Sequence, residues 1–269
     1  MLTDEQRFLF DLKGWLLLPG ILDAAQTTAC RDHVLQSVEQ CASVSSSSSG
    51  AAYVDPVAEL FDHPEVVSIL EEILSDRKPS DDYYDFRCED SFFSVRSAGF
   101  LPGETKVPHV VQNPQRGGPM TYHCRNRRIY SGLTRVVWEL NEVQAGKGGT
   151  QFVSGTHKAD FPFPDSVRVP DNPLLETYSC PAGSALIFSE SLLHASTTWT
   201  DTQRQRVSIF TAYNSLWAQW YRMNLDIAKI EKMPKRRQSL FRGVFAYDFN
   251  QTSPTHGYNS AFSDLNHAL

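Results

Sequence analysis

The chain has 269 residues, of which 41% are hydrophobic and 12% aromatic, so it can bury a sizeable core. Its 31 acidic and 25 basic side chains give a formal net charge of −6, which argues against a general nucleic-acid-binding surface. The N-terminus lacks a signal-peptide pattern, no apolar run reaches membrane-spanning length, and the five scattered cysteines form no Cys-x-x-Cys pair. These features predict a cytoplasmic protein with free thiols and no membrane partner.

The first part of the chain, to about residue 90, predicts helices around one short strand. Thr3 and Gln6 match a capping box, which starts a helix that ends near Gly14. The apolar run Trp15–Leu18 then predicts a short buried strand. Two further helices are expected at 24–42 and 64–74, and a serine-rich surface loop at 45–50.

From about residue 91 to 215 the pattern changes to short β-branched and aromatic runs separated by glycine, proline and asparagine turns. This pattern predicts a mainly β core with flanking helices, in a single domain spanning 1–269. The glycine-rich stretch 146–149 lacks a phosphate-loop pattern and predicts a turn between strands. The remaining segment, 216–269, predicts helix with a break at Pro234, and its aromatic group predicts core packing, with a substrate-lining role as the alternative. This group comprises Trp217, Trp220 and Tyr221.

Several segments, taken in order, resemble one protein family. They are MLTDEQRFLFDLKGWLLLPGILD, HPEVVSILEEIL, LTRVVWELNEVQAGKGGTQFVSGTHK, GSALIFSESLLHASTTW and RQRVSIFTAY. Together they are similar to the phytanoyl-CoA dioxygenase-like proteins and cover most of the chain. The resemblance implies a double-stranded β-helix (a cupin-like jelly roll) that binds Fe(II) and uses 2-oxoglutarate as co-substrate.

His194 is the candidate for the distal metal ligand. It follows the strand-like run Ala185–Phe188 by six residues, where a core strand has no need of an imidazole. Non-haem iron oxygenases bind Fe(II) through two histidines and one carboxylate, which leaves positions open for co-substrate and oxygen. The alternative is a histidine in a surface loop, and the flanking resemblance favours the ligand.

Arg206, twelve residues after His194, is the candidate anchor for 2-oxoglutarate. A guanidinium grips a carboxylate through two parallel hydrogen bonds, which suits the distal carboxylate of this co-substrate. By strand alternation Ser208 shares a face with Arg206 and is expected to assist. Arg204 is the competing candidate.

The first metal ligand is less clear, because the family's His-any-Asp motif is absent. His109 is followed at the second position by Val111, and His123 by Arg125. The spacing usual in the family suits His123. On a strand, however, Arg125 would then face the metal, and a unit charge about 5 Å from a divalent ion is repelled by roughly 7 kcal/mol at an effective dielectric near 20. The stretch 121–131 also predicts an inserted hairpin. We therefore favour His109, with His123 as a close alternative, and a site that uses both is possible.

The missing carboxylate leaves three interpretations. Glu139 in the central strand is one candidate replacement. Alternatively, halide or water fills the position, as in the family's halogenating relatives, or the site is catalytically dead. His157 resembles a structural element of the family and is expected to stabilise a turn. The sequence thus predicts Fe(II)- and 2-oxoglutarate-dependent hydroxylation, or a related C–H functionalisation, of a small molecule. A halogenase-like variant and a non-catalytic small-molecule-binding protein on the same scaffold are the alternatives.

Overall fold

A computed structural model describes residues 1–40, 50–75, 79–100, 106–170, 172–221, 223 and 225–244. The expected serine-rich loop falls outside these ranges except for Gly50, as does the part of the expected C-terminal helical segment beyond residue 244. Within the described ranges, no helix has both the length and the apolar character that crossing a membrane requires.

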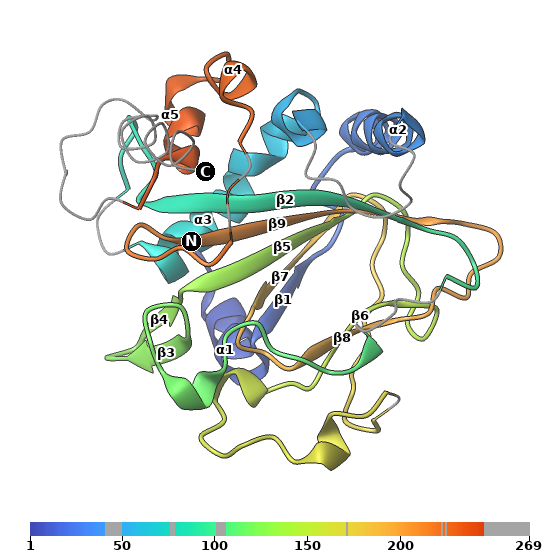
Figure 1. The fold of residues 1–269 in the computed structure, drawn as a ribbon, viewed down its shortest axis with the longest axis vertical. Coiled ribbons are helices and arrows are strands. Elements are labelled where there is room, and N and C mark those ends of the chain that lie inside the picture. Colours follow the sequence, from blue (N-terminus) through green and yellow to red (C-terminus); the bar gives the residue numbers. More distant parts are fainter. Residues whose placement is uncertain are drawn as a thin grey trace, which may run out of the picture.

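A five-stranded antiparallel sheet forms the centre of the fold (Figure 1). Its strands run in the spatial order β1 (Trp15–Leu18), β7 (Ser184–Ser189), β5 (Leu133–Glu139), β9 (Arg206–Ser215) and β2 (Phe86–Arg96). Two further antiparallel pairs are β6 (Gly149–Phe152) with β8 (His194–Thr197) and β3 (Tyr122–Arg125) with β4 (Arg128–Ser131). Figure 1 shows the β6–β8 pair on the opposite side of the central sheet from α2, α4 and α5.

The helices lie where the sequence predicts them. They are α1 (Asp4–Lys13), α2 (Ala24–Gln40), α3 (Pro64–Leu74), α4 (Ile227–Ile230) and α5 (Lys235–Gln238). The capping box at Thr3 is present, and Gly14 ends α1 in the left-handed conformation. The C-terminal helix is broken at Pro234, as predicted, but the described pieces are single turns rather than a long helix. Both α2 and α3 pack against β2 and β9.

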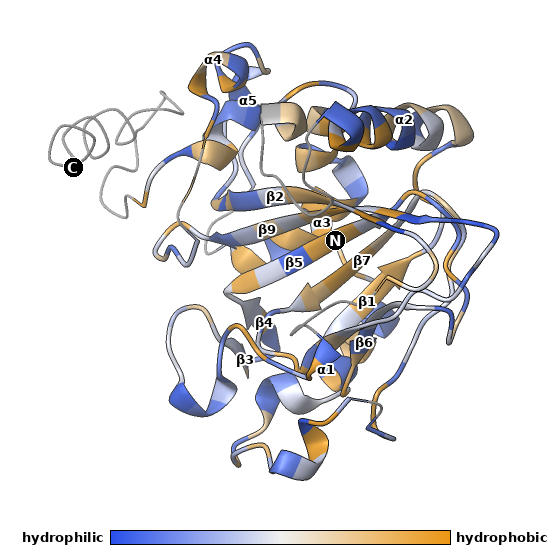
Figure 2. Ribbon diagram, turned by 45° about the vertical axis from the view of Figure 1, so that its right-hand side comes forward, coloured by the Kyte–Doolittle hydropathy of each residue, from blue (hydrophilic) through white to orange (hydrophobic). Residues whose placement is uncertain are grey.

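The central sheet buries both faces, and strand alternation decides which residues each face contributes. On the outer face, Trp138 of β5 and Ile209 of β9 join a core with the helices. On the inner face, Val137 of β5 and Phe188 of β7 join a second core that includes Phe152 of β6. Figure 2 shows the resulting concentration of hydrophobic residues in β1 and β7.

The inner face also carries an unusual row of charged and polar side chains. Arg135 and Glu139 alternate with the outward-facing residues of β5, and Arg206 and Ser208 do the same on β9. The register aligns Arg206 with Arg96 of β2. Charged groups buried between two sheets are costly unless they are paired or hold a ligand. This face is therefore where a functional site is expected.

The predicted hairpin at 121–131 is present as β3 and β4. Its two turn residues, Asn126 and Arg127, have φ angles of 52° and 62°, the left-handed conformation that two-residue hairpin turns require. The hairpin packs against α3 through β4. The glycine-rich stretch 146–149 forms a turn before β6, also as predicted. At Gly148 a Cβ atom would lie 2.8 Å from the backbone of Trp199, so only glycine fits there.

Candidate metal and co-substrate site

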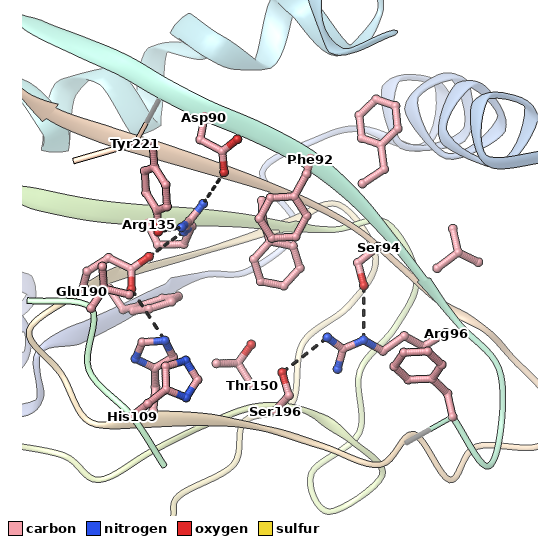
Figure 3. A pocket seen from close by; sticks show the side chains of 17 residues that line it. Asp90, Phe92, Ser94, Arg96, His109, Arg135, Thr150, Glu190, Ser196 and Tyr221 are labelled. Carbon is pink, nitrogen blue, oxygen red and sulfur yellow. Dashed lines mark hydrogen bonds and ion pairs between the residues drawn. The ribbon is translucent and has the colours of Figure 1, made fainter. Parts of the chain in front are cut away.

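A pocket of about 410 Å³ lies on the inner face of the central sheet (Figure 3). Both sheets contribute to it, with Phe210 of β9 and Phe188 of β7 on one side and Thr150 of β6 and Ser196 of β8 on the other. Its remaining walls come from β2, from the segment around His109 and from Tyr221. The pocket is thus enclosed by segments distant in the sequence.

His109 and His194 meet at one end of this pocket. Their backbones form an antiparallel bridge, with N···O distances of 2.9 and 3.0 Å, and their ring centroids are 4.5 Å apart. The Nδ1 atom of His109 lies 2.9 Å from the carbonyl oxygen of Val107, and that of His194 lies 2.7 Å from the carbonyl oxygen of Leu192. Because a carbonyl oxygen only accepts, each Nδ1 carries the proton and each Nε2 keeps a lone pair for a metal.

Electrostatics favour the neutral state of His194. Burial lowers the pKa of His194 to about 4, against a partial opposing effect from Glu190. The imidazole is therefore neutral near pH 7, which is the form that binds a metal ion.

Two other candidate residues lie away from this pair. His123 is exposed on β3 and contacts the ring of Tyr130, with ring centroids 4.8 Å apart. Arg204 pairs with Glu142 and, at 3.1 Å, with Asp201, and it is absent from the pocket lining. The structure thus brings His109 together with His194, and does not bring His123 or Arg204 to them.

Arg206 is fully buried beside the pocket, but its charge is already compensated. Its Nη2 donates to Oε1 of Glu139 at 2.5 Å and its Nε to Oε2 at 3.2 Å. The hydroxyl of Tyr178 donates to the same carboxylate at 2.6 Å. Burial alone would lower the pKa of Arg206, but the charge of Glu139 raises it above its ordinary value. Glu139, which the sequence suggested as a metal ligand, therefore neutralises the arginine instead.

Arg96 brings a second guanidinium to this end of the pocket. Its Nε donates to Ser94 at 3.2 Å and its Nη2 to Ser196 at 3.4 Å. No carboxylate pairs with it among the described residues, and burial together with the charge of Arg206 lowers its pKa to about 10. This end of the pocket thus has one excess positive charge, because the two guanidinium groups of Arg96 and Arg206 face the single carboxylate of Glu139.

Near Arg96 and Arg206, three buried polar atoms have no hydrogen-bond partner among the described residues. They are Nη1 of Arg96, Nη1 of Arg206 and Oγ of Ser208. As predicted from strand alternation, Ser208 lies on the same face as Arg206. Unpaired buried donors beside an uncompensated positive charge are suited to receive an anion, such as a carboxylate.

The opposite end of the pocket carries an excess of negative charge. Arg135 donates through Nε to Oε1 of Glu190 at 2.7 Å and lies 3.5 Å from Oδ2 of Asp90. The hydroxyl of Tyr221 accepts from the same guanidinium at 2.6 Å. Two carboxylates thus share one cation. Figure 3 shows Glu190 between Arg135 and the side of the pocket that holds His109.

The two ends are set apart by the length of one strand. Arg135 and Glu139 lie four residues apart on one face of β5, which places their backbones about 13 Å from each other. The pocket therefore favours a cation near the histidine pair and an anion near Arg96.

The residues present fit a metal ion in part. Within the described ranges, no three His, Cys, Asp or Glu side chains are already spaced to hold a metal ion. The histidine pair supplies two neutral donors with fixed tautomers, as two of the usual three ligands. Val111, at the position of the expected carboxylate, lines the pocket but has no donor atom.

Reasoning from the sequence missed Arg96, Arg135, Asp90 and Glu190. The polar residues Asp90, Ser94 and Arg96 lie at even spacings on one face of β2, which was a signal that this face binds a ligand. Tyr221 corrects another expectation, since it lines the pocket rather than the core, while Trp217 and Trp220 are 43% and 49% exposed. His157 behaves as expected of a turn-stabilising residue: it is buried, and its Nε2 lies 3.1 Å from the carbonyl oxygen of Asp11.

Two facing antiparallel sheets with a histidine pair and a buried arginine between them define the double-stranded β-helix class of non-haem iron enzymes. The sequence profile of the phytanoyl-CoA dioxygenase (PhyH) family matches residues 10–207, which is more than half of the chain. The protein therefore belongs to the PhyH family. This membership confirms the resemblance and makes the chain a 2-oxoglutarate-dependent non-haem iron enzyme by family, with Fe(II) and 2-oxoglutarate as cofactors.

Several solved structures share this fold. HygX from Streptomyces hygroscopicus, crystallised with nickel and 2-oxoglutarate, has a TM-score of 0.65 at 18% identity and covers 82% of this chain and 90% of its own. The 2-oxoglutarate-dependent epimerase SnoN of nogalamycin biosynthesis has a TM-score of 0.55 at 15% identity, covering 83% and 85%. The carbocyclase SnoK of the same biosynthesis has a TM-score of 0.55 at 16% identity, covering 87% and 92%. These likenesses confirm the jelly-roll fold. No curated protein matches the chain.

Proposed function

We propose that this protein catalyses the Fe(II)- and 2-oxoglutarate-dependent oxidation of a small molecule, by hydroxylation or a related C–H functionalisation. In this proposal His109 and His194 hold the metal through their Nε2 atoms. Arg206, with Arg96 and Ser208, receives the distal carboxylate of the co-substrate. The observation that carries the proposal is the separation of charge along one pocket. The histidine pair and Glu190 line one end, and Arg96 lines the other, where Arg206 is its partner in the strand register.

When bound, Fe(II) would supply the redox chemistry by which O₂ oxidises both 2-oxoglutarate, giving succinate and CO₂, and a C–H bond of the substrate. The chain's own residues prepare the place where this happens. The backbone carbonyls behind His109 and His194 fix which nitrogen carries the proton. The aromatic pair Phe92 and Phe210 stacks with ring centroids 4.8 Å apart, and both rings line the pocket. Apolar walls of this kind exclude water and strengthen the electrostatic interactions inside.

The substrate is proposed to be a small organic molecule, because a pocket of about 410 Å³ falls in the size range usual for small-molecule sites. The solved relatives support this size class: HygX has been crystallised with hygromycin B and SnoN with nogalamycin RO. We place the protein in the cytoplasm, since the described cysteines, Cys30, Cys88, Cys124 and Cys180, are free thiols, as a reducing compartment favours.

Succinate release tests the proposal directly. The protein is supplied with Fe(II), 2-oxoglutarate and oxygen, alone and with candidate small molecules, and compared with His194→Ala and with His123→Ala. We expect succinate from the wild type and from H123A but not from H194A. Equal succinate release by wild type and H194A would refute the metal site, and no release from any would favour a non-catalytic binding protein. A requirement for chloride, or chlorine in the product, would identify a halogenating variant.

A further inference from the structure

We infer that Glu190 is the third metal ligand and supplies the carboxylate that Val111 lacks. This inference rests on the proposed function, because it concerns the metal held by His109 and His194. It would make the site a two-histidine, one-carboxylate centre whose acidic ligand comes from the segment after β7 rather than from the position two residues after the first histidine.

The backbone places Glu190 beside the position that the expected aspartate would occupy. The carbonyl oxygen of Glu190 accepts from the N–H of Val111 at 3.0 Å and from that of Gln112 at 3.0 Å. Four residues later in the chain, His194 pairs with His109 across the same pair of segments. Residues 109 and 111 on one segment therefore face residues 194 and 190 on the other. A carboxylate from position 190 reaches the same region as one from position 111.

One oxygen of Glu190 is held and the other is available. Arg135 donates to Oε1 at 2.7 Å, which fixes the orientation of the carboxylate. Oε2 is buried, accepts no hydrogen bond from any described residue, and lies 3.6 Å from Nε2 of His194. A buried carboxylate oxygen without a donor is costly, and His194 with its proton on Nδ1 has no N–H to offer it. A metal ion between Oε2 and the two Nε2 atoms would satisfy all three.

The distance is close to what a shared metal requires. Two donors, each about 2.1 Å from one metal ion and at right angles, lie about 3 Å apart. The separation between Oε2 and Nε2 of His194 is 3.6 Å, so the two atoms need to approach by roughly half an ångström. This is a small adjustment for a glutamate side chain. Arg135 acts as a positioning residue, since ligating carboxylates are themselves hydrogen-bonded in metal sites.

A double-mutant cycle on metal affinity tests the assignment without measuring catalysis. Co(II) is titrated into wild type, E190Q, V111D and the E190Q/V111D double variant, and binding is followed by calorimetry and by the visible absorption of the bound ion. V111D restores the His-any-Asp motif. If Glu190 is the ligand, E190Q weakens Co(II) binding roughly 10- to 100-fold, V111D strengthens it little in the wild-type background, and V111D restores binding in the E190Q background.

Two controls separate the possible failures. Asp90→Asn removes the other carboxylate that pairs with Arg135 at the same end of the pocket, so it measures the contribution of general charge, and its loss of Co(II) affinity should be clearly smaller than that of E190Q if Glu190 is a ligand. An equal loss in D90N and E190Q, an unchanged affinity in E190Q, or an equal gain from V111D in both backgrounds would overturn the assignment of Glu190. If instead H194A binds Co(II) as tightly as wild type, the proposed function itself fails. Thermal unfolding of each metal-free variant identifies any that do not fold.

Discussion

Arg96→Gln tests whether the uncompensated positive charge of the pocket recognises the co-substrate. Glu139 already neutralises Arg206, with N···O distances of 2.5 and 3.2 Å, so Arg96 carries the net charge at this end. A hydrogen bond to a charged group contributes about 1.5–3 kcal/mol. Its loss should raise the Kd for 2-oxoglutarate about 10- to 150-fold, at 1.4 kcal/mol per factor of ten.

The assay compares 2-oxoglutarate with 2-oxopentanoate, which keeps the metal-binding 2-oxo acid but has a methyl group where the distal carboxylate would be. Both are titrated calorimetrically into the Co(II)-loaded protein. We expect R96Q to lose affinity for 2-oxoglutarate and to bind 2-oxopentanoate as the wild type does. Arg204→Gln, which removes a guanidinium from a surface ion pair, is the matched control and should affect neither ligand. An equal loss for both ligands, or no loss for either, would refute the reasoning.

Three further predictions concern stability and the unused histidine. Burial lowers the pKa of both His157 and His194 to about 4. Between pH 6.5 and 4 the unfolded chain therefore binds more protons than the folded chain. The unfolding free energy of the metal-free protein should fall by about 3 kcal/mol per histidine as pH decreases through this window. Urea titrations across this pH window measure the loss of stability, and His157→Gln should roughly halve it. An unfolding free energy that does not change with pH would contradict the prediction. Gly14 has a φ of +83°, and Gly14→Ala would place a Cβ 2.5 Å from Nδ1 of His157. The substitution should lower the unfolding free energy by at least about 1–2 kcal/mol, measured as a lower Tm. An unchanged Tm would show that the end of the helix relaxes freely. His123→Ala should leave Co(II) affinity unchanged, because the side chain is exposed on β3, and a tenfold loss would place it in the site after all.

Local sequence signals were sufficient for most of the fold. The capping box at Thr3, the apolar spacing of α3 and the turn residues of the β3–β4 hairpin act within a few residues, so each element could be predicted from its own segment. The central sheet is different, because β1 pairs with β7 and β2 pairs with β9 across most of the chain. Such pairings depend on the packing of two faces at once. The family resemblance, rather than the spacing of any motif, supplied that part of the prediction.

The site could be predicted only where one segment carried its signal. His194 stood out because it follows a strand-like run and Arg206 because it lies within one, and His109 was favoured on the charge that Arg125 would bring beside His123. Glu139 was considered only as a ligand, since nothing in β5 indicates that an arginine of β9 pairs with its side chain. Arg96 is separated from Arg206 by more than one hundred residues, and strand register alone makes them neighbours.

The charges of the pocket form a pattern that links two features of the site, Val111 in place of the expected carboxylate and Glu139 paired with Arg206. Arg135, Arg96 and Arg206 face Asp90, Glu190 and Glu139, so the six charges sum to zero but are sorted into a negative and a positive end. A divalent metal ion adds two positive charges at the first end and 2-oxoglutarate adds two negative charges that reach the second. Either ligand alone leaves the buried pocket with a net charge, whereas both together leave it neutral, and a low-dielectric interior favours the neutral combination. A valine at position 111 and a glutamate at position 139 thus need not abolish this balance, because Glu190 and Arg96 carry the same charges from neighbouring strands and segments to the same two ends.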